Sequence, residues 1–88
     1  MKMIVSILQD SDKDNVVKAL NEAGYQVTVM PSTGGYFRRG NTTLLVGTED
    51  EKVKTAIEVI KGNCKEPDEL GMRRATIFVL NIESHEKV

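Results

Sequence analysis

Four short stretches of the chain are apolar or alternate in polarity, and they contain many of the β-branched residues that favour strands. They are Met3–Leu8, Tyr25–Met30, Thr42–Gly47 and Ala75–Ile82. The alternation in the second stretch predicts that Tyr25, Val27 and Val29 point to one face of a sheet. Pro31 lacks a backbone N–H, so we expect it to end this strand or to lie at a sheet edge.

Two segments between these strands repeat apolar residues every three or four positions, which predicts helices with one buried face. The repeated positions are Val16, Val17, Leu20 and Ala23 in the first segment and Val53, Ala56, Ile57 and Ile60 in the second. A hydroxyl residue followed three positions later by an acid predicts a capping box at each start, at Ser11–Asp14 and Thr48–Glu51. We expect glycines to end the two helices, at Gly24 and Gly62.

The order of the elements is strand, helix, strand, strand, helix, strand. Right-handed crossovers then place both helices on one face of a four-stranded antiparallel sheet, which is the ferredoxin-like arrangement. The fold class predicted is α+β, and the 88 residues fit a single domain spanning 1–88.

Both faces of the predicted sheet are apolar. Met3, Val5 and Ile7 alternate with Ile4 and Leu8 in the first strand, and the third and fourth strands show the same pattern. Two helices cover only one face, and each large apolar side chain left in water forfeits roughly 1.5–3 kcal/mol of burial free energy. We therefore expect the second face to pack against further copies of the chain. The alternative is a monomer with a few outward aliphatic side chains on short strands.

Composition narrows the classes of function. The formal net charge is −1, so no overall positive field would attract nucleic acid or a membrane surface. The apolar runs are too short to span a bilayer, and the start of the chain has no small-residue cleavage site typical of a signal peptide. Cys64 is the only cysteine, which excludes an internal disulfide and indicates a reducing, cytoplasmic location.

The residues suited to catalysis are few and scattered. His85 lies in the terminal segment, and Cys64 follows a predicted helix end with no second cysteine or nearby histidine. Asp10, Asp12 and Asp14 surround a helix start, where acids complement the helix dipole better than they would build a Mg²⁺ site. We predict no enzyme activity, no catalytic residue and no metal site.

The segment Ser32–Thr43, with the sequence STGGYFRRGNTT, is unusual for a connection between two strands. Its three glycines allow backbone N–H groups to turn toward an anion, and Arg38 and Arg39 offer guanidinium groups that suit phosphate. Tyr36 and Phe37 offer faces on which a base would stack. Asn41 has an amide that suits an adenine edge, and Thr28 lies on the strand that leads into the segment. The alternative is a flexible glycine loop with solvated arginines.

The stretches MKMIVSILQD, TGGYFRRGNTTLLVG, NCK and ATIFVL, in this order, make the chain resemble the PII-like cyclic di-AMP receptor family. The resemblance implies a bacterial signalling protein that forms a homotrimer, with its sheets facing the threefold axis and the nucleotide held between neighbouring subunits. It implies ligand contacts from these residues: Thr28, Gly35, Tyr36, Phe37, Asn41 and Gly47. The protein target of such a receptor stays unknown.

The chain departs from the family at three places. The connection between the second helix and the last strand is short, Gln26 stands where an arginine is usual, and Met72, Arg73 and Arg74 replace glycines. Two other hypotheses stay open: a trimer of the same family without ligand binding, and a nucleic-acid-binding module of the RRM kind. The second needs aromatic residues on the exposed strands and a basic face, and TTLLVG provides neither.

Overall fold

The computed structural model describes residues 1–31, 40–65 and 75–83. The elements are β1 (Lys2–Gln9), α1 (Asp10–Glu22), β2 (Val27–Pro31), β3 (Asn41–Thr48), a 3₁₀ turn η1 (Asp50–Lys52), α2 (Val53–Gly62) and β4 (Ala75–Asn81). This order confirms the predicted succession of strands and helices. None of the helices in these ranges is both long and apolar enough to cross a bilayer.

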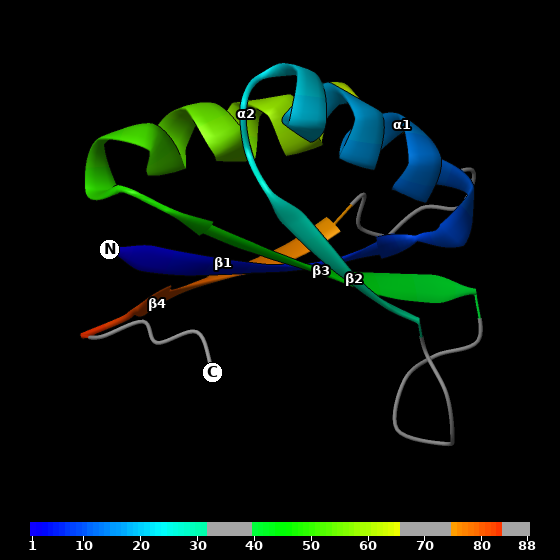
Figure 1. The fold of residues 1–88 in the computed structure, drawn as a ribbon. Coiled ribbons are helices and arrows are strands. Elements are labelled where there is room, and N and C mark those ends of the chain that lie inside the picture. The colour runs from blue at the N-terminus through cyan, green and yellow to red at the C-terminus, as the bar shows by residue number, and fades with distance from the viewer. Residues whose placement is uncertain (32–39, 66–74, 84–88) are drawn as a thin grey trace.

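The four strands form one antiparallel sheet in the order β2-β3-β1-β4. Both helices lie against the same face of the sheet (Figure 1), so the chain has the predicted α+β ferredoxin-like layout. Val5 pairs with Leu45 on β3 and with Phe78 on β4, which fixes the side chains that share a face. Pro31 is the last residue of the edge strand β2, as predicted.

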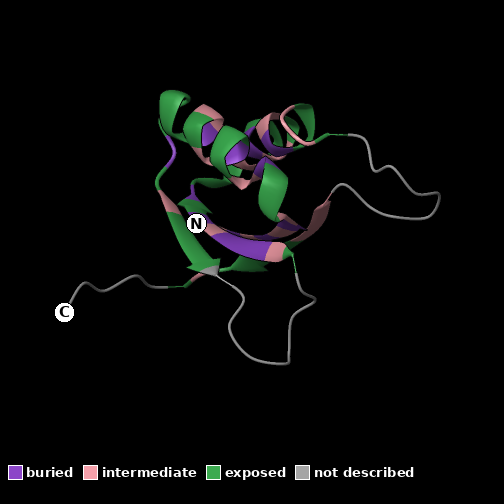
Figure 2. Cartoon of the chain, turned by 90° about the vertical axis from the view of Figure 1, so that its right-hand side faces the viewer, coloured by how far each residue is buried: buried purple, intermediate pink, exposed green. Residues whose placement is uncertain are grey.

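The core lies between the helices and the covered face of the sheet (Figure 2). Alternate residues of the central strands point into it, and the apolar stripe of each helix packs against them. The core members with at most 2% exposure are Ile4, Leu8, Val16, Leu20, Leu44, Val46, Ala56 and Ile60. The periodicity in the sequence therefore identified most of the helix positions that are buried.

The predicted capping boxes are wrong at both helix starts. Helix α1 begins at Asp10, directly after β1, so Ser11 lies inside the first turn and cannot act as its cap. Thr48 is still the last residue of β3, and the 3₁₀ turn separates it from α2. Neither start has a side-chain cap hydrogen bond. Asp10 and Asp12 do occupy the first turn of α1, where their charge complements the helix dipole.

The end of α1 is a Schellman motif. Gly24 has φ +92°, its N–H donates to the Asn21 carbonyl at 3.1 Å, and the Tyr25 N–H donates to the Leu20 carbonyl at 2.9 Å. Gly24 thus ends the helix as expected, and α2 also ends at the expected glycine, with Gly62 as its last residue. Tyr25 was expected on the second strand but precedes it. The residue is 8% exposed, and its hydroxyl donates to the Lys52 carbonyl at 2.9 Å, which links the end of α1 to η1.

Candidate functional site

The face of the sheet that the helices leave open is apolar, as the sequence predicted. The pairing register places Met3, Val5 and Leu45 on this face together with Phe78 and Leu80. Phe78 is 52% exposed and Leu80 is 54% exposed, and both are large enough to form an apolar patch with their neighbours. Such a patch indicates a surface that contacts another molecule.

A hollow of about 180 Å³ lies on this open face, near the start of β2 and the end of β3. We call it the sheet hollow, and its lining residues are Met1, Met3, Gln26, Thr28, Leu45, Gly47 and Ile82. Thr28 and Gly47, two of the ligand contacts implied by the family resemblance, line it together. Thr28 pairs with Leu45, so the hydroxyl stands beside an apolar side chain on the adjacent strand.

Gly47 lines the sheet hollow without a side chain of its own. The backbone there does not require glycine, because among the described glycines only Gly24 and Gly40 have positive φ. A Cβ added at Gly47 would meet only the Met1 Cε atom, at 3.8 Å, which is an ordinary contact. Neither the backbone nor the packing of a single chain explains the missing side chain, but the space it leaves belongs to the hollow.

Asn41 lies at the other end of β3. It pairs with Gln9, whereas Gly47 pairs with Met3, six residues further along the strand. At about 3.3 Å per residue, this separates the two backbones by about 20 Å. The structure therefore brings Thr28 and Gly47 together, but it does not bring Asn41 of the same chain to the sheet hollow.

The start of β3 is tied to the start of α1. Gly40, with φ +88°, accepts a hydrogen bond at 2.7 Å from the Asp10 N–H, and the Thr42 hydroxyl donates to the Asp10 carboxylate. These contacts fix the chain immediately before Asn41. The other expected contacts lie outside the described residues; they are Gly35, Tyr36, Phe37, Arg38 and Arg39.

Two of the residues that were weighed for catalysis, Asp12 and Cys64, occupy structural positions. Asp12 is fully buried, and its Oδ1 accepts a hydrogen bond at 3.2 Å from the Lys65 backbone N–H, so it holds the segment after α2. Its Oδ2 has no hydrogen-bond partner. Cys64 is partly buried against the core, and His85 lies outside the described residues. Within the described ranges, no group of three metal-ligating side chains occurs.

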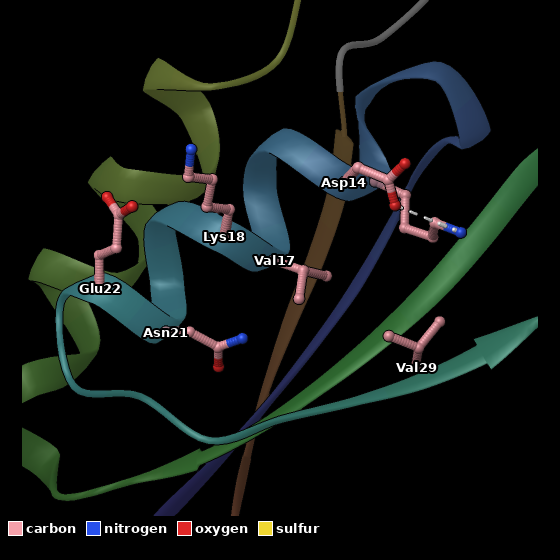
Figure 3. A pocket seen from close by; sticks show the side chains of 7 residues that line it. Asp14, Val17, Lys18, Asn21, Glu22 and Val29 are labelled. Carbon is pink, nitrogen blue, oxygen red and sulfur yellow. Dashed lines mark ion pairs between the residues drawn. The ribbon is translucent and has the colours of Figure 1, made fainter.

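A second depression, of about 570 Å³, lies between α1 and the edge strand β2 (Figure 3). Val17 and Val29 form its apolar part, and Lys13 pairs with Asp14 at 3.5 Å on its rim. None of the ligand contacts implied by the sequence lines it. A third depression, of about 540 Å³, adjoins the sheet hollow, because Met1, Gln26 and Gly47 line both, and Glu49 and Lys52 add charged groups to it. Among these three depressions of the described residues, the sheet hollow is the one that both Thr28 and Gly47 line, so it is the candidate site.

Sequence reasoning missed much of the wall of the sheet hollow. Met3 and Leu45 follow from the two-residue period of strands once the register is known, because they pair with Gly47 and Thr28 respectively. Gln26 lies two positions before Thr28, so the same period was a usable signal for it. The hydrogen bonds that Asp10 forms with Gly40 and Thr42 had no signal in the sequence, because they depend on how α1 follows β1 in space.

The fold and the hollow define a small α+β ferredoxin-like domain with a mostly apolar depression on its open sheet face. A family model described as cyclic-di-AMP receptor matches residues 1–76, so the chain belongs to the cyclic-di-AMP receptor family. A crystal structure of a functionally unknown protein from Pediococcus pentosaceus ATCC 25745 is also similar. It is 27% identical in sequence, has a TM-score of 0.82, and the match covers 99% of this chain and 96% of that one. The family is one of nucleotide-binding receptors rather than enzymes.

Proposed function

We propose that this protein is a non-enzymatic cytoplasmic signalling protein of a bacterium, a single domain over residues 1–88, which binds cyclic di-AMP or a related adenine nucleotide between the subunits of a homotrimer. The observation that carries the proposal is the position of Thr28 and Gly47 in one hollow of the open sheet face. Membership of the cyclic-di-AMP receptor family supplies the class of ligand.

The size of the sheet hollow supports partial enclosure of the ligand by one chain. Its volume of about 180 Å³ is below the ~300–1,000 Å³ of pockets that enclose whole drug-sized molecules. One base of a cyclic dinucleotide would enter it, and the rest of the ligand would lie against other groups. Arg38 and Arg39 are the candidates for the phosphates, and Tyr36 or Phe37 for stacking on a base.

The position of Asn41 supports a site that two subunits share. Since about 20 Å of strand separates Asn41 from Gly47 in one chain, a single nucleotide would contact both most directly if they came from different chains. The apolar open face provides the contact surface. Phe78 and Leu80 are about half exposed. Full burial of such a side chain contributes about 1.5–3 kcal/mol, so association of the subunits would gain roughly half of that free energy for each of them.

Two measurements test the proposal. Calorimetric titration of the purified protein with cyclic di-AMP, other cyclic dinucleotides, ATP and AMP should show binding of cyclic di-AMP. Sedimentation should give three times the 9.8 kDa chain mass. A trimer that binds none of these nucleotides would instead be the structural member of the family that has lost its ligand.

An RNA-binding function has less support. Among the described strand residues, Phe78 is the only aromatic one, whereas RRM-type recognition stacks bases on several. A gel shift with single-stranded RNA should stay negative even at low salt, where electrostatic binding is strongest.

A further inference from the structure

Gln26 is the side chain in the sheet hollow with the greatest capacity for hydrogen bonds. It stands two positions before Thr28, and both residues line the hollow. Both are exposed, and the structure gives the Gln26 amide no hydrogen-bond partner among the described residues. Its donor and acceptor are therefore free to bind a molecule that enters the hollow.

The wall of the hollow has no charged side chain. Besides Gln26 and Thr28 it presents Gly47 and the apolar side chains of Met1, Met3, Leu45 and Ile82. Of the lining residues, Met1 carries a cation, its α-ammonium, and that group already forms an ion pair with Asp50 Oδ1 at 3.2 Å. A nucleobase fits the chemistry better than a phosphate, because its ring faces are apolar and its edge has donors and acceptors in the ring plane.

We propose that Gln26 distinguishes adenine from guanine in the sheet hollow, an inference that rests on the proposed function. A primary amide offers one donor and one acceptor side by side. The adenine edge at N6 and N7 offers the complementary pair, so two parallel hydrogen bonds form. The guanine edge at O6 and N7 has two acceptors, and one of them would face the amide oxygen.

The test compares cyclic di-AMP and cyclic di-GMP on the full-length protein and on two variants. Gln26→Met has about the same length but no hydrogen-bonding groups, so it keeps the apolar contact and removes the recognition. Gln26→Glu has only acceptors, and one of them would face N7 of adenine. Because position 26 is exposed and its amide has no hydrogen-bond partner in the described ranges, both variants should keep the wild-type circular dichroism spectrum.

We expect the wild type to prefer cyclic di-AMP. In Gln26→Met the affinity for cyclic di-AMP should fall about tenfold, within the range of one bidentate base contact, while that for cyclic di-GMP changes little. Gln26→Glu should lose at least as much. A residue that only shapes the rim would change both affinities together and leave their ratio unaltered, which would overturn the assignment.

An independent readout needs no substitution. In the wild type, the side-chain N–H₂ resonances of Gln26 in a ¹⁵N-labelled sample should shift when cyclic di-AMP is added. If the wild type binds cyclic di-AMP but these resonances do not move, the assignment of Gln26 is wrong and the proposed function stands. If the wild type binds no adenine nucleotide at all, the proposed function fails, and the inference about Gln26 fails with it.

Discussion

Replacing Gly47 by alanine should separate ligand binding from folding. The added methyl group meets only the Met1 Cε atom, at 3.8 Å, and the backbone is not in the left-handed region. A glycine within a strand costs roughly 0.5–1 kcal/mol relative to alanine, mainly through the freedom of the unfolded chain. The free energy of unfolding should therefore stay constant or rise by about that amount.

The same methyl group points into the sheet hollow, where a base would contact the bare backbone of β3. An extra methyl in a closely packed site costs about 1–3 kcal/mol. At 1.4 kcal/mol for each factor of ten, the affinity for cyclic di-AMP should fall between about fivefold and about a hundredfold. The loss should appear mainly as faster dissociation, as for most changes within one interface.

Calorimetric titration measures the affinity, and urea unfolding at the same protein concentration measures the stability. Gly62→Ala is the matched control, because Gly62 also has open space around its added Cβ but lies at the end of α2, outside the sheet hollow. It should leave the affinity unchanged. If Gly47→Ala binds cyclic di-AMP within twofold of wild type, with an unchanged mass, the base does not lie against Gly47.

Three other substitutions give distinct expectations. Asn41→Ala should weaken binding of cyclic di-AMP in calorimetry without unfolding the protein; unchanged affinity would remove Asn41 from the site. Tyr25→Phe deletes the 2.9 Å hydrogen bond to the Lys52 carbonyl and should lower the free energy of unfolding by about 0.5–1.5 kcal/mol in urea, whereas a larger loss would indicate that the ring is displaced. Thr42→Val removes the hydroxyl that donates to Asp10 and should lower the free energy of unfolding by about 1–3 kcal/mol. An unchanged free energy of unfolding would show that this contact does not hold the start of β3.

The fold could be predicted because each element has its own signal in the sequence. The apolar spacing from Val16 to Leu20 identified α1, and Gly24 marked its end. The helix starts could not be predicted in the same way. Ser11 and Thr48 have the residue types of caps, but β1 runs directly into α1 and β3 continues to Thr48, so tertiary geometry displaced the local pattern.

The site was only partly predictable. Thr28 and Gly47 came from the family resemblance, and the structure places them in one hollow. Residue spacing alone would not have joined them, because they are distant in sequence and meet only through the β2–β3 register. The separation of Asn41 from Gly47, in contrast, follows from the predicted strand itself, because six residues of extended chain span about 20 Å. Whether the glycine and aromatic residues of 32–39 complete the site stays a prediction.

Mixing two defective chains tests most directly whether subunits share the site. Asn41→Ala and Gly47→Ala chains would be unfolded together, refolded as mixed oligomers and titrated with cyclic di-AMP. If Asn41 and Gly47 at each site come from different subunits, random assembly restores both in roughly a quarter of the sites, and these should bind with wild-type affinity. If both residues act within one chain, no such sites form, and a mixture that binds as weakly as its two components would contradict the account.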